Sequence, residues 1–137
     1  MKTDLFYYQN LQQLNPQNSR VSAYPLYNDF LQSLFKIIED NIDDPVLTVG
    51  FLAINMAVSR STLNRKLSAI IGLSTNELIR QYRLQRAATF LLSGKNVSET
   101  AYLTSFETPS YFVQCFKEFY KMTPKEYSKS NSLIRIA

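Results

Sequence analysis

Histidine and tryptophan are absent from this sequence, and it has only one cysteine and three glycines. Because zinc fingers, Ser-His-Asp triads and Cys-His pairs need histidine, the sequence excludes these sites. One cysteine cannot form an internal disulfide, and so few glycines argue against sandwiches, barrels and glycine-rich phosphate loops. No paired-carboxylate or metal-ligand spacing stands out. We therefore expect no enzyme activity, no cofactor and no metal site.

Long apolar runs are also missing, since none approaches the roughly 20 residues that a membrane-spanning helix needs. The first residues lead into polar sequence rather than into the apolar region of a signal peptide. We expect a cytoplasmic protein with no membrane partner. The 137 residues include 45% hydrophobic and 19% charged residues, which is enough apolar sequence for the core of one domain.

Charge is unevenly distributed along the chain. Residues 28–58 have a net charge of −4, whereas residues 59–95 have a net charge of +6. A basic segment beside an acidic one is typical of a surface that binds a polyanion. A solvated helix surface explains the same charges equally well, so charge alone does not decide.

Helical periodicity begins at Asn28 and continues to the C-terminal region, with no convincing strand pattern. We predict an all-α fold of about seven helices, with Asn28 as the first N-cap and Gly72 and Gly94 as helix stops. The other expected N-caps are Thr48, Ser59, Ser74, Asn96, Thr108 and Thr123. The predicted organisation is an N-terminal arm or linker (1–27), a domain (28–130) and a C-terminal tail (131–137). Within the domain, we expect a first helix-turn-helix unit (28–73), a connecting helix (74–94) and a second unit (95–130).

The domain contains an approximate internal repeat. Ala53 corresponds to Ala101 at an offset of 48, and Ser59 corresponds to Thr108 at an offset of 49. Each copy has a short helix with a central alanine, a tight turn, a Ser/Thr cap and a second helix, which is the helix-turn-helix pattern. The alanine allows the two helices to cross closely, so we expect both alanines to be buried. The further pairs are Leu63 and Phe112, Leu67 and Phe116, Ile70 and Phe119, Ser74 and Thr123, and Glu77 and Glu126.

These features resemble the DNA-binding domain of AraC/XylS-family transcription regulators over about residues 30–128. The most specific stretch is Ser110-Tyr111-Phe112, Phe116-Lys117 and Thr123-Pro124, supported by Leu52-Ala53, Arg65-Lys66-Leu67 and Gly72-Leu73-Ser74. The family usually has glycine at the positions of Ser105 and Lys121, a branched apolar residue at Thr100 and arginine at Ser128. More loosely, the sequence resembles the output domains of Bacteroidetes hybrid two-component regulators.

The resemblance implies DNA contacts from the two second helices of the repeat. The implied contact residues are Ser59, Arg60, Ser61, Asn64 and Arg65 in the first unit, and Thr108, Ser110, Gln114 and Lys117 in the second. Arginine pairs with guanine and asparagine with adenine in the major groove. Ser59 and Thr108 also serve as caps, and Arg65 has a salt bridge as its alternative. Tyr111 is expected either to pack in the core or to form a hydrogen bond with a phosphate. Arg80, Arg83 and Arg86 are expected either to face phosphates or to hold the two units together.

We therefore predict a sequence-specific DNA-binding transcription regulator that inserts two recognition helices into successive major-groove segments of double-stranded DNA. The connecting helix would be roughly 27–29 Å long at 1.5 Å per residue, and major-groove sites on one DNA face lie about 34 Å apart. Family members usually carry a sensor or dimerisation domain in a longer chain. The alternative is a non-catalytic helical adaptor that binds an acidic protein partner.

Overall fold

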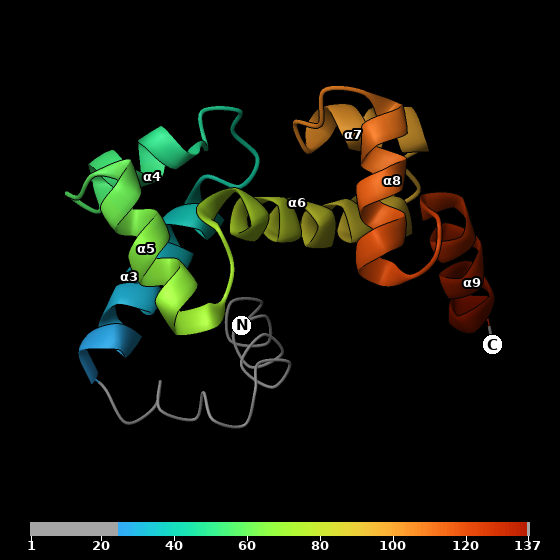
Figure 1. Ribbon diagram of the computed structural model, residues 1–137. Coiled ribbons are helices and arrows are strands. Elements are labelled where there is room, and N and C mark those ends of the chain that lie inside the picture. Colours follow the sequence, from blue (N-terminus) through green and yellow to red (C-terminus); the bar gives the residue numbers. More distant parts are fainter. Residues whose placement is uncertain (1–24, 137) are drawn as a thin grey trace. The chain divides into compact units, whose positions relative to one another are not determined.

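The computed structural model describes the backbone of residues 25–136 and the side chains of residues 29–130. The regular secondary structure of this part of the chain consists only of α-helices, which confirms the predicted all-α fold class (Figure 1). Its elements are α3 (Pro25–Asp40), α4 (Val49–Asn55), α5 (Arg60–Ile71), α6 (Thr75–Leu92), α7 (Val97–Leu103), α8 (Pro109–Tyr120) and α9 (Pro124–Ile136). Most of the predicted arm, residues 1–24, lies outside the described residues.

Among the described residues, the first compact unit comprises 25–41 together with Val46–Ile79. In it, α3 packs against α4 and α4 packs against α5. Ala53 is only 3% exposed, so the predicted burial of this alanine is confirmed. The other buried side chains of this unit come from all of its helices and include Leu31, Leu34, Phe35, Ile38, Leu52, Leu63, Leu67 and Leu78.

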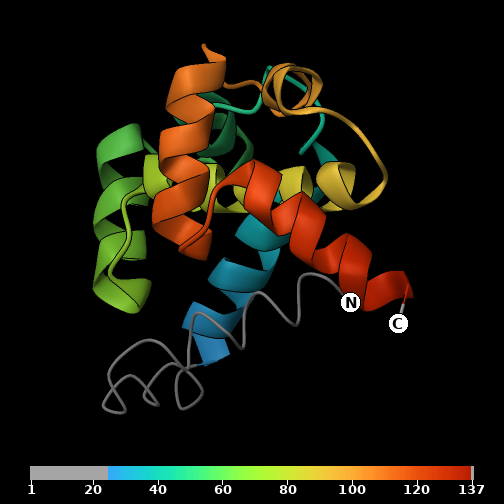
Figure 2. The same cartoon turned by 90° about the vertical axis from the view of Figure 1, so that its right-hand side faces the viewer.

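The second unit comprises Ile42–Pro45 and the residues from Arg80 onward. Here α8 contacts both α7 and α9, and Figure 2 shows α8 in orange and α9 in red. Ala101 is 1% exposed, so the second crossing alanine is also buried as predicted. The core of this unit consists of Leu84, Ala87, Ala88, Leu91, Ala101, Phe112, Cys115 and Phe116.

Most helix starts follow the predicted capping signals. Thr48, Ser59, Asn96 and Thr108 each accept a hydrogen bond from a backbone N–H in the first turn of the following helix. Such a bond satisfies an N–H that has no partner inside the helix. The Ser74 hydroxyl accepts from the Glu77 N–H, while the Glu77 carboxylate accepts from the Ser74 N–H. Thr123 and Glu126 form the same two hydrogen bonds. These hydrogen bonds from Thr123 hold the pKa of the Glu126 carboxyl below its ordinary value.

The two ends of the domain differ from the predicted boundaries. The prediction that Asn28 caps the first helix is wrong, because α3 already begins at Pro25. Proline is well suited to a first turn, where its missing N–H needs no partner. At the other end, α9 continues through Ile136 and so includes most of the segment 131–137, which was assigned to a tail.

Within the part of the chain that the structure describes, three residues other than glycine adopt left-handed backbone conformations, and they lie at repeated positions. Ala57 and Ser105 occupy the turns of the two helix-turn-helix units, with φ of 58° and 63°. Lys121 ends α8 with φ of 63°, as Gly72 ends α5 with φ of 72°. A left-handed conformation brings Cβ too close to the following carbonyl oxygen, whereas glycine avoids this contact. Two of the departures from the family pattern, Ser105 and Lys121, therefore lie where the backbone favours glycine.

Replacing Lys121 with glycine is expected to stabilise the second unit by about 1 kcal/mol, because glycine removes the left-handed strain at the end of α8. Urea unfolding of the wild type and Lys121→Gly measures the difference. Lys121→Ala, which keeps a Cβ, is the matched control and should give no comparable gain. An equal gain in the alanine variant would mean that the lysine side chain, rather than the backbone conformation, causes the effect.

Candidate nucleic-acid interface

The outer face of α5 is polar and exposed. Arg60, Ser61, Asn64 and Arg65 are all exposed, whereas the buried stripe includes Leu63. Because this stripe fixes the rotation of the helix about its own axis, the four polar side chains lie off the stripe, with Ser61 and Arg65 farthest from it and Arg60 and Asn64 at its border. The structure thus brings the predicted contact residues of the first unit onto one surface.

Ser59 is engaged at the start of this helix. Its Oγ accepts a hydrogen bond from the Thr62 N–H at 3.1 Å and donates one to Thr62 Oγ1 at 2.9 Å. Thr108 has a similar position in the second unit, where its Oγ1 accepts from the Tyr111 N–H at 3.1 Å. Both residues therefore act as caps, which was the structural alternative for each. A DNA contact from either side chain stays a prediction.

Arg60 lies against the first turn of α4. A Cβ placed on Gly50 would come within 2.6 Å of Arg60 Nη2, so the guanidinium occupies the space that the glycine leaves open. The sequence did not single out Gly50, because nothing local relates a glycine in one helix to an arginine ten positions later. Arg60 is consequently directed by α4 as well as by its own helix.

Asn64 uses its side-chain oxygen within the first unit. Its Oδ1 accepts hydrogen bonds from the Thr75 backbone N–H at 2.8 Å and from Thr75 Oγ1 at 2.9 Å. The sequence analysis also missed Thr75, although its position directly after the Ser74 cap marks an N–H that needs a partner. Asn64 thus links the exposed face of α5 to the first turn of α6.

The second unit presents a comparable face on α8. Ser110, Gln114 and Lys117 are exposed along one side of the helix, while Phe112 and Phe116 are completely buried on the other. Thr108 and Pro109 fix the start of this helix through a cap followed by proline. The structure therefore brings these three predicted contact residues together on one exposed helix face.

Tyr111 lies beside this face and is partly packed. Its ring centroid is 6.0 Å from that of Phe106, and the residue is 45% exposed. A hydrogen bond with the Cys115 thiol raises the pKa of the Tyr111 hydroxyl, and the neighbouring Arg80 guanidinium opposes this effect. The ring contact with Phe106 favours the packing alternative for Tyr111, and a phosphate contact from its hydroxyl stays a prediction.

The other arginines of α6 have structural partners or are partly buried. Arg86 forms two hydrogen bonds with the Asp43 carboxylate, at 2.9 and 3.0 Å, and its guanidinium lies 4.4 Å from the Phe90 ring centroid. Burial lowers the pKa of Arg83 from its ordinary value. These contacts favour the structural alternative for both residues. Arg86 holds the segment 42–45 against the second unit.

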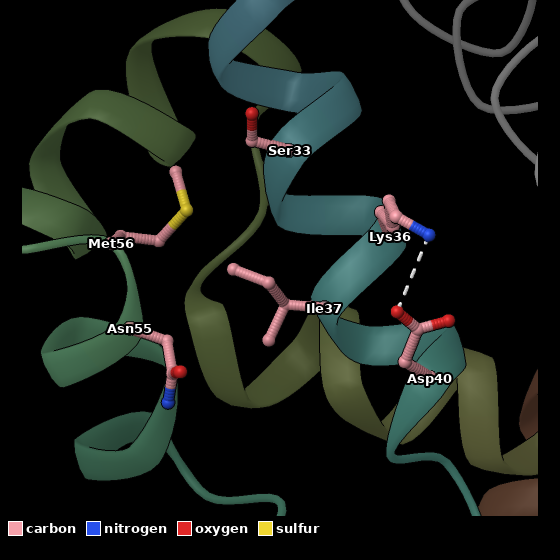
Figure 3. Close-up of a pocket in the computed structure, with 6 residues that line it drawn as sticks. All are labelled: Ser33, Lys36, Ile37, Asp40, Asn55 and Met56. Atoms are coloured by element: carbon pink, nitrogen blue, oxygen red, sulfur yellow. Dashed lines mark ion pairs between the residues drawn. The ribbon is translucent and has the colours of Figure 1, made fainter.

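An open hollow of about 450 Å³ lies between α3 and α4, away from the exposed face of α5. Figure 3 shows its lining, in which Lys36 pairs with Asp40 at 3.4 Å. Apolar atoms of Ile37 and Met56 contribute to the same surface. Among the described residues, no cluster of three or more potential ligands is able to hold a metal ion. No described helix has both the length and the apolar character required to span a bilayer.

The two units together define a class of protein, a tandem helix-turn-helix domain with two exposed polar recognition helices. A family model described as a helix-turn-helix domain matches residues 52–130, which is more than half of the chain. The chain therefore belongs to this helix-turn-helix family. A solved Chromobacterium violaceum transcriptional regulator with an AraC-type DNA-binding domain has the same fold, with a TM-score of 0.70 and 22% identity. The similarity covers 77% of this chain and 95% of that one.

Two of the curated relatives are much longer than this chain. The HTH-type transcriptional regulator AdiY of Escherichia coli is 31% identical over 105 residues, which is 76% of this chain and 41% of AdiY. Histidine kinase P4 of Formosa agariphila is 32% identical over 126 residues, which is 91% of this chain and 9% of the kinase. The chain therefore spans less than half of each of these two relatives.

Proposed function

We propose that this chain is the DNA-binding part of a transcription regulator and that it inserts α5 and α8 into successive major-groove segments of double-stranded DNA. The observation that carries this proposal is the repeated construction of the two helices. Each begins at a Ser/Thr cap, is held by an apolar stripe with two completely buried side chains and exposes polar side chains off that stripe. An α-helix fits the major groove, where polar side chains reach the base edges.

The exposed side chains divide into two kinds of proposed contact. Arg65, Asn64 and Gln114 have planar polar groups suited to base edges, whereas Lys117 has a point charge suited to phosphate. Arg60, at the first position of α5, is also placed to meet the DNA backbone. Base contacts set sequence preference, and phosphate contacts set affinity and position.

The longer relatives support a second part of the proposal. The region similar to this chain makes up 9% of a protein named as a histidine kinase and 41% of one named as a transcriptional regulator. We infer that the domain acts as the output portion of a longer regulator, with a sensor or dimerisation domain as its partner. Kinase activity is no part of this proposal, because the described residues of this chain form a helix-turn-helix domain.

Binding-site selection from a random duplex library tests the proposed function. The purified chain should enrich two short sequence elements about one helical turn apart, because the two recognition helices contact successive major-groove segments. Enrichment of no sequence would contradict specific recognition. Enrichment of one element alone would mean that the second unit contributes only contacts with the DNA backbone.

Replacing Gly50 with alanine is expected to weaken DNA binding several-fold without loss of stability. The new Cβ displaces the Arg60 guanidinium, while alanine favours the helix by roughly 0.5–1 kcal/mol relative to glycine. Fluorescence anisotropy with a selected duplex and urea unfolding measure the two effects. In an Arg60→Ala background, the same glycine change should cost no further affinity. An additional loss there would show that Gly50 itself, rather than the position of Arg60, affects binding.

A further inference from the structure

The side-chain amide of Asn64 has its oxygen fully occupied within the protein. An amide oxygen has two lone pairs, and here both accept hydrogen bonds from Thr75, one from the backbone N–H and one from the hydroxyl. The backbone N–H only donates, so the atom facing it must be the oxygen and the assignment of O and N is fixed. Only the two N–H groups of Nδ2 remain for an external partner.

The backbone N–H and hydroxyl of Thr75 depend on Asn64 Oδ1 as their hydrogen-bond acceptor. Thr75 is completely buried, and its N–H belongs to the first turn of α6, where no carbonyl of the helix can accept it. The Ser74 hydroxyl does not serve this group because it accepts from the Glu77 N–H at 3.1 Å. Rotating the Asn64 amide toward DNA would leave a buried donor without its acceptor, which is costly.

We propose that Asn64 recognises DNA only as a hydrogen-bond donor, and that its oxygen positions the amide by capping α6. This inference rests on the proposed function and specifies the chemistry of one contact. A donor-only group favours base edges that carry acceptors without a neighbouring donor: guanine presents O6 and N7 and thymine presents O4, whereas adenine presents N7 beside an amino donor. Asparagine pairs with adenine through both its oxygen and its nitrogen, and this arrangement is unavailable to Asn64. The structure thus corrects the adenine pairing expected from residue type.

Asn64→Asp separates the two roles. One carboxylate oxygen keeps the bond to Thr75, and the other presents an acceptor in place of Nδ2. In site selection, the base pair whose preference disappears in Asn64→Ala identifies the contacted position. We expect the wild type to select guanine or thymine there and Asn64→Asp to select cytosine or adenine, which present amino donors. Wild-type preference for adenine over both guanine and thymine at that position would require the Asn64 oxygen to accept from the adenine amino group and would overturn the donor-only inference, as would the absence of any change there in both variants.

Unfolding provides a second test that does not depend on DNA. Asn64→Ala should lower the folding equilibrium constant about 5-fold, in line with loss of a helix cap, and Asn64→Asp should restore it. Ser61→Ala, on the same exposed face but without a capping contact, is the control and should leave it unchanged. Equal stability of the wild type and Asn64→Ala would overturn the capping role. Intact capping without any selected DNA sequence would contradict the proposed function instead.

Discussion

Arg65→Ala is expected to reduce affinity for a selected site by about 1–3 kcal/mol and to abolish base preference in one half of that site. Arg65 lies on the exposed face of α5, whereas Gln114 lies on that of α8. Gln114→Ala should therefore remove preference in the other half, about one helical turn away. The second effect should be smaller, because the second unit departs more from the family pattern.

Lys117→Ala provides the control for this pair of variants. Its charge is suited to phosphate, so its loss should weaken binding to all sequences alike and leave the selected sequence unchanged. Site selection with each variant, followed by anisotropy titration of the selected duplexes, measures both properties. If Arg65→Ala and Gln114→Ala lose preference at the same base pairs, the proposal of two separate recognition helices is wrong.

Phe116→Ala is expected to destabilise the second unit by about 3–5 kcal/mol, the usual cost of removing a large buried aromatic side chain. Phe116 is completely buried, with ring centroids 5.7 Å from Phe112, 4.5 Å from Tyr120 and 5.4 Å from Tyr127. The Phe116 ring thus contacts two other rings of α8 and one ring of α9, and its removal leaves a cavity between the two helices. Circular dichroism during urea unfolding measures the loss.

The same experiment has a matched pair of controls. Leu67→Ala truncates the equivalent buried position of the first unit and should cost about 2–5 kcal/mol. Phe119→Ala removes a ring that is only partly buried, so its cost should be clearly smaller than that of Phe116→Ala. A cost below about 1 kcal/mol for Phe116→Ala would contradict the packing described for the second unit.

The helix starts were largely predictable because their causes are local. Ser59 and Thr108 each bond to a residue three positions later, and the apolar stripes follow from helical spacing. The prediction of Asn28 as an N-cap was wrong because an asparagine before an apolar helical pattern can also lie inside the first turn of the helix. The family resemblance marked Lys121 as a position that usually has glycine, although its left-handed conformation became evident only in the structure.

The parts that sequence did not predict depend on contacts between separate elements. Asn64 meets Thr75 eleven positions later, Arg60 fills the space above Gly50, and Arg86 pairs with Asp43 across 43 positions. Residue type alone suggested an adenine contact for Asn64, and it left both phosphate contact and a structural role open for Arg86. Only the fold shows which hydrogen-bonding atoms are already used and which remain available at the surface.

Salt dependence of binding to random-sequence duplex DNA tests the central claim most directly. Double-stranded DNA releases condensed counterions when basic side chains neutralise its phosphates, so affinity falls as salt rises. If this chain neutralises about six phosphates, the plot of log affinity against log salt concentration should have a slope of about −5 between 50 and 200 mM salt. A slope near zero would contradict DNA binding and favour the alternative of a helical adaptor for an acidic protein.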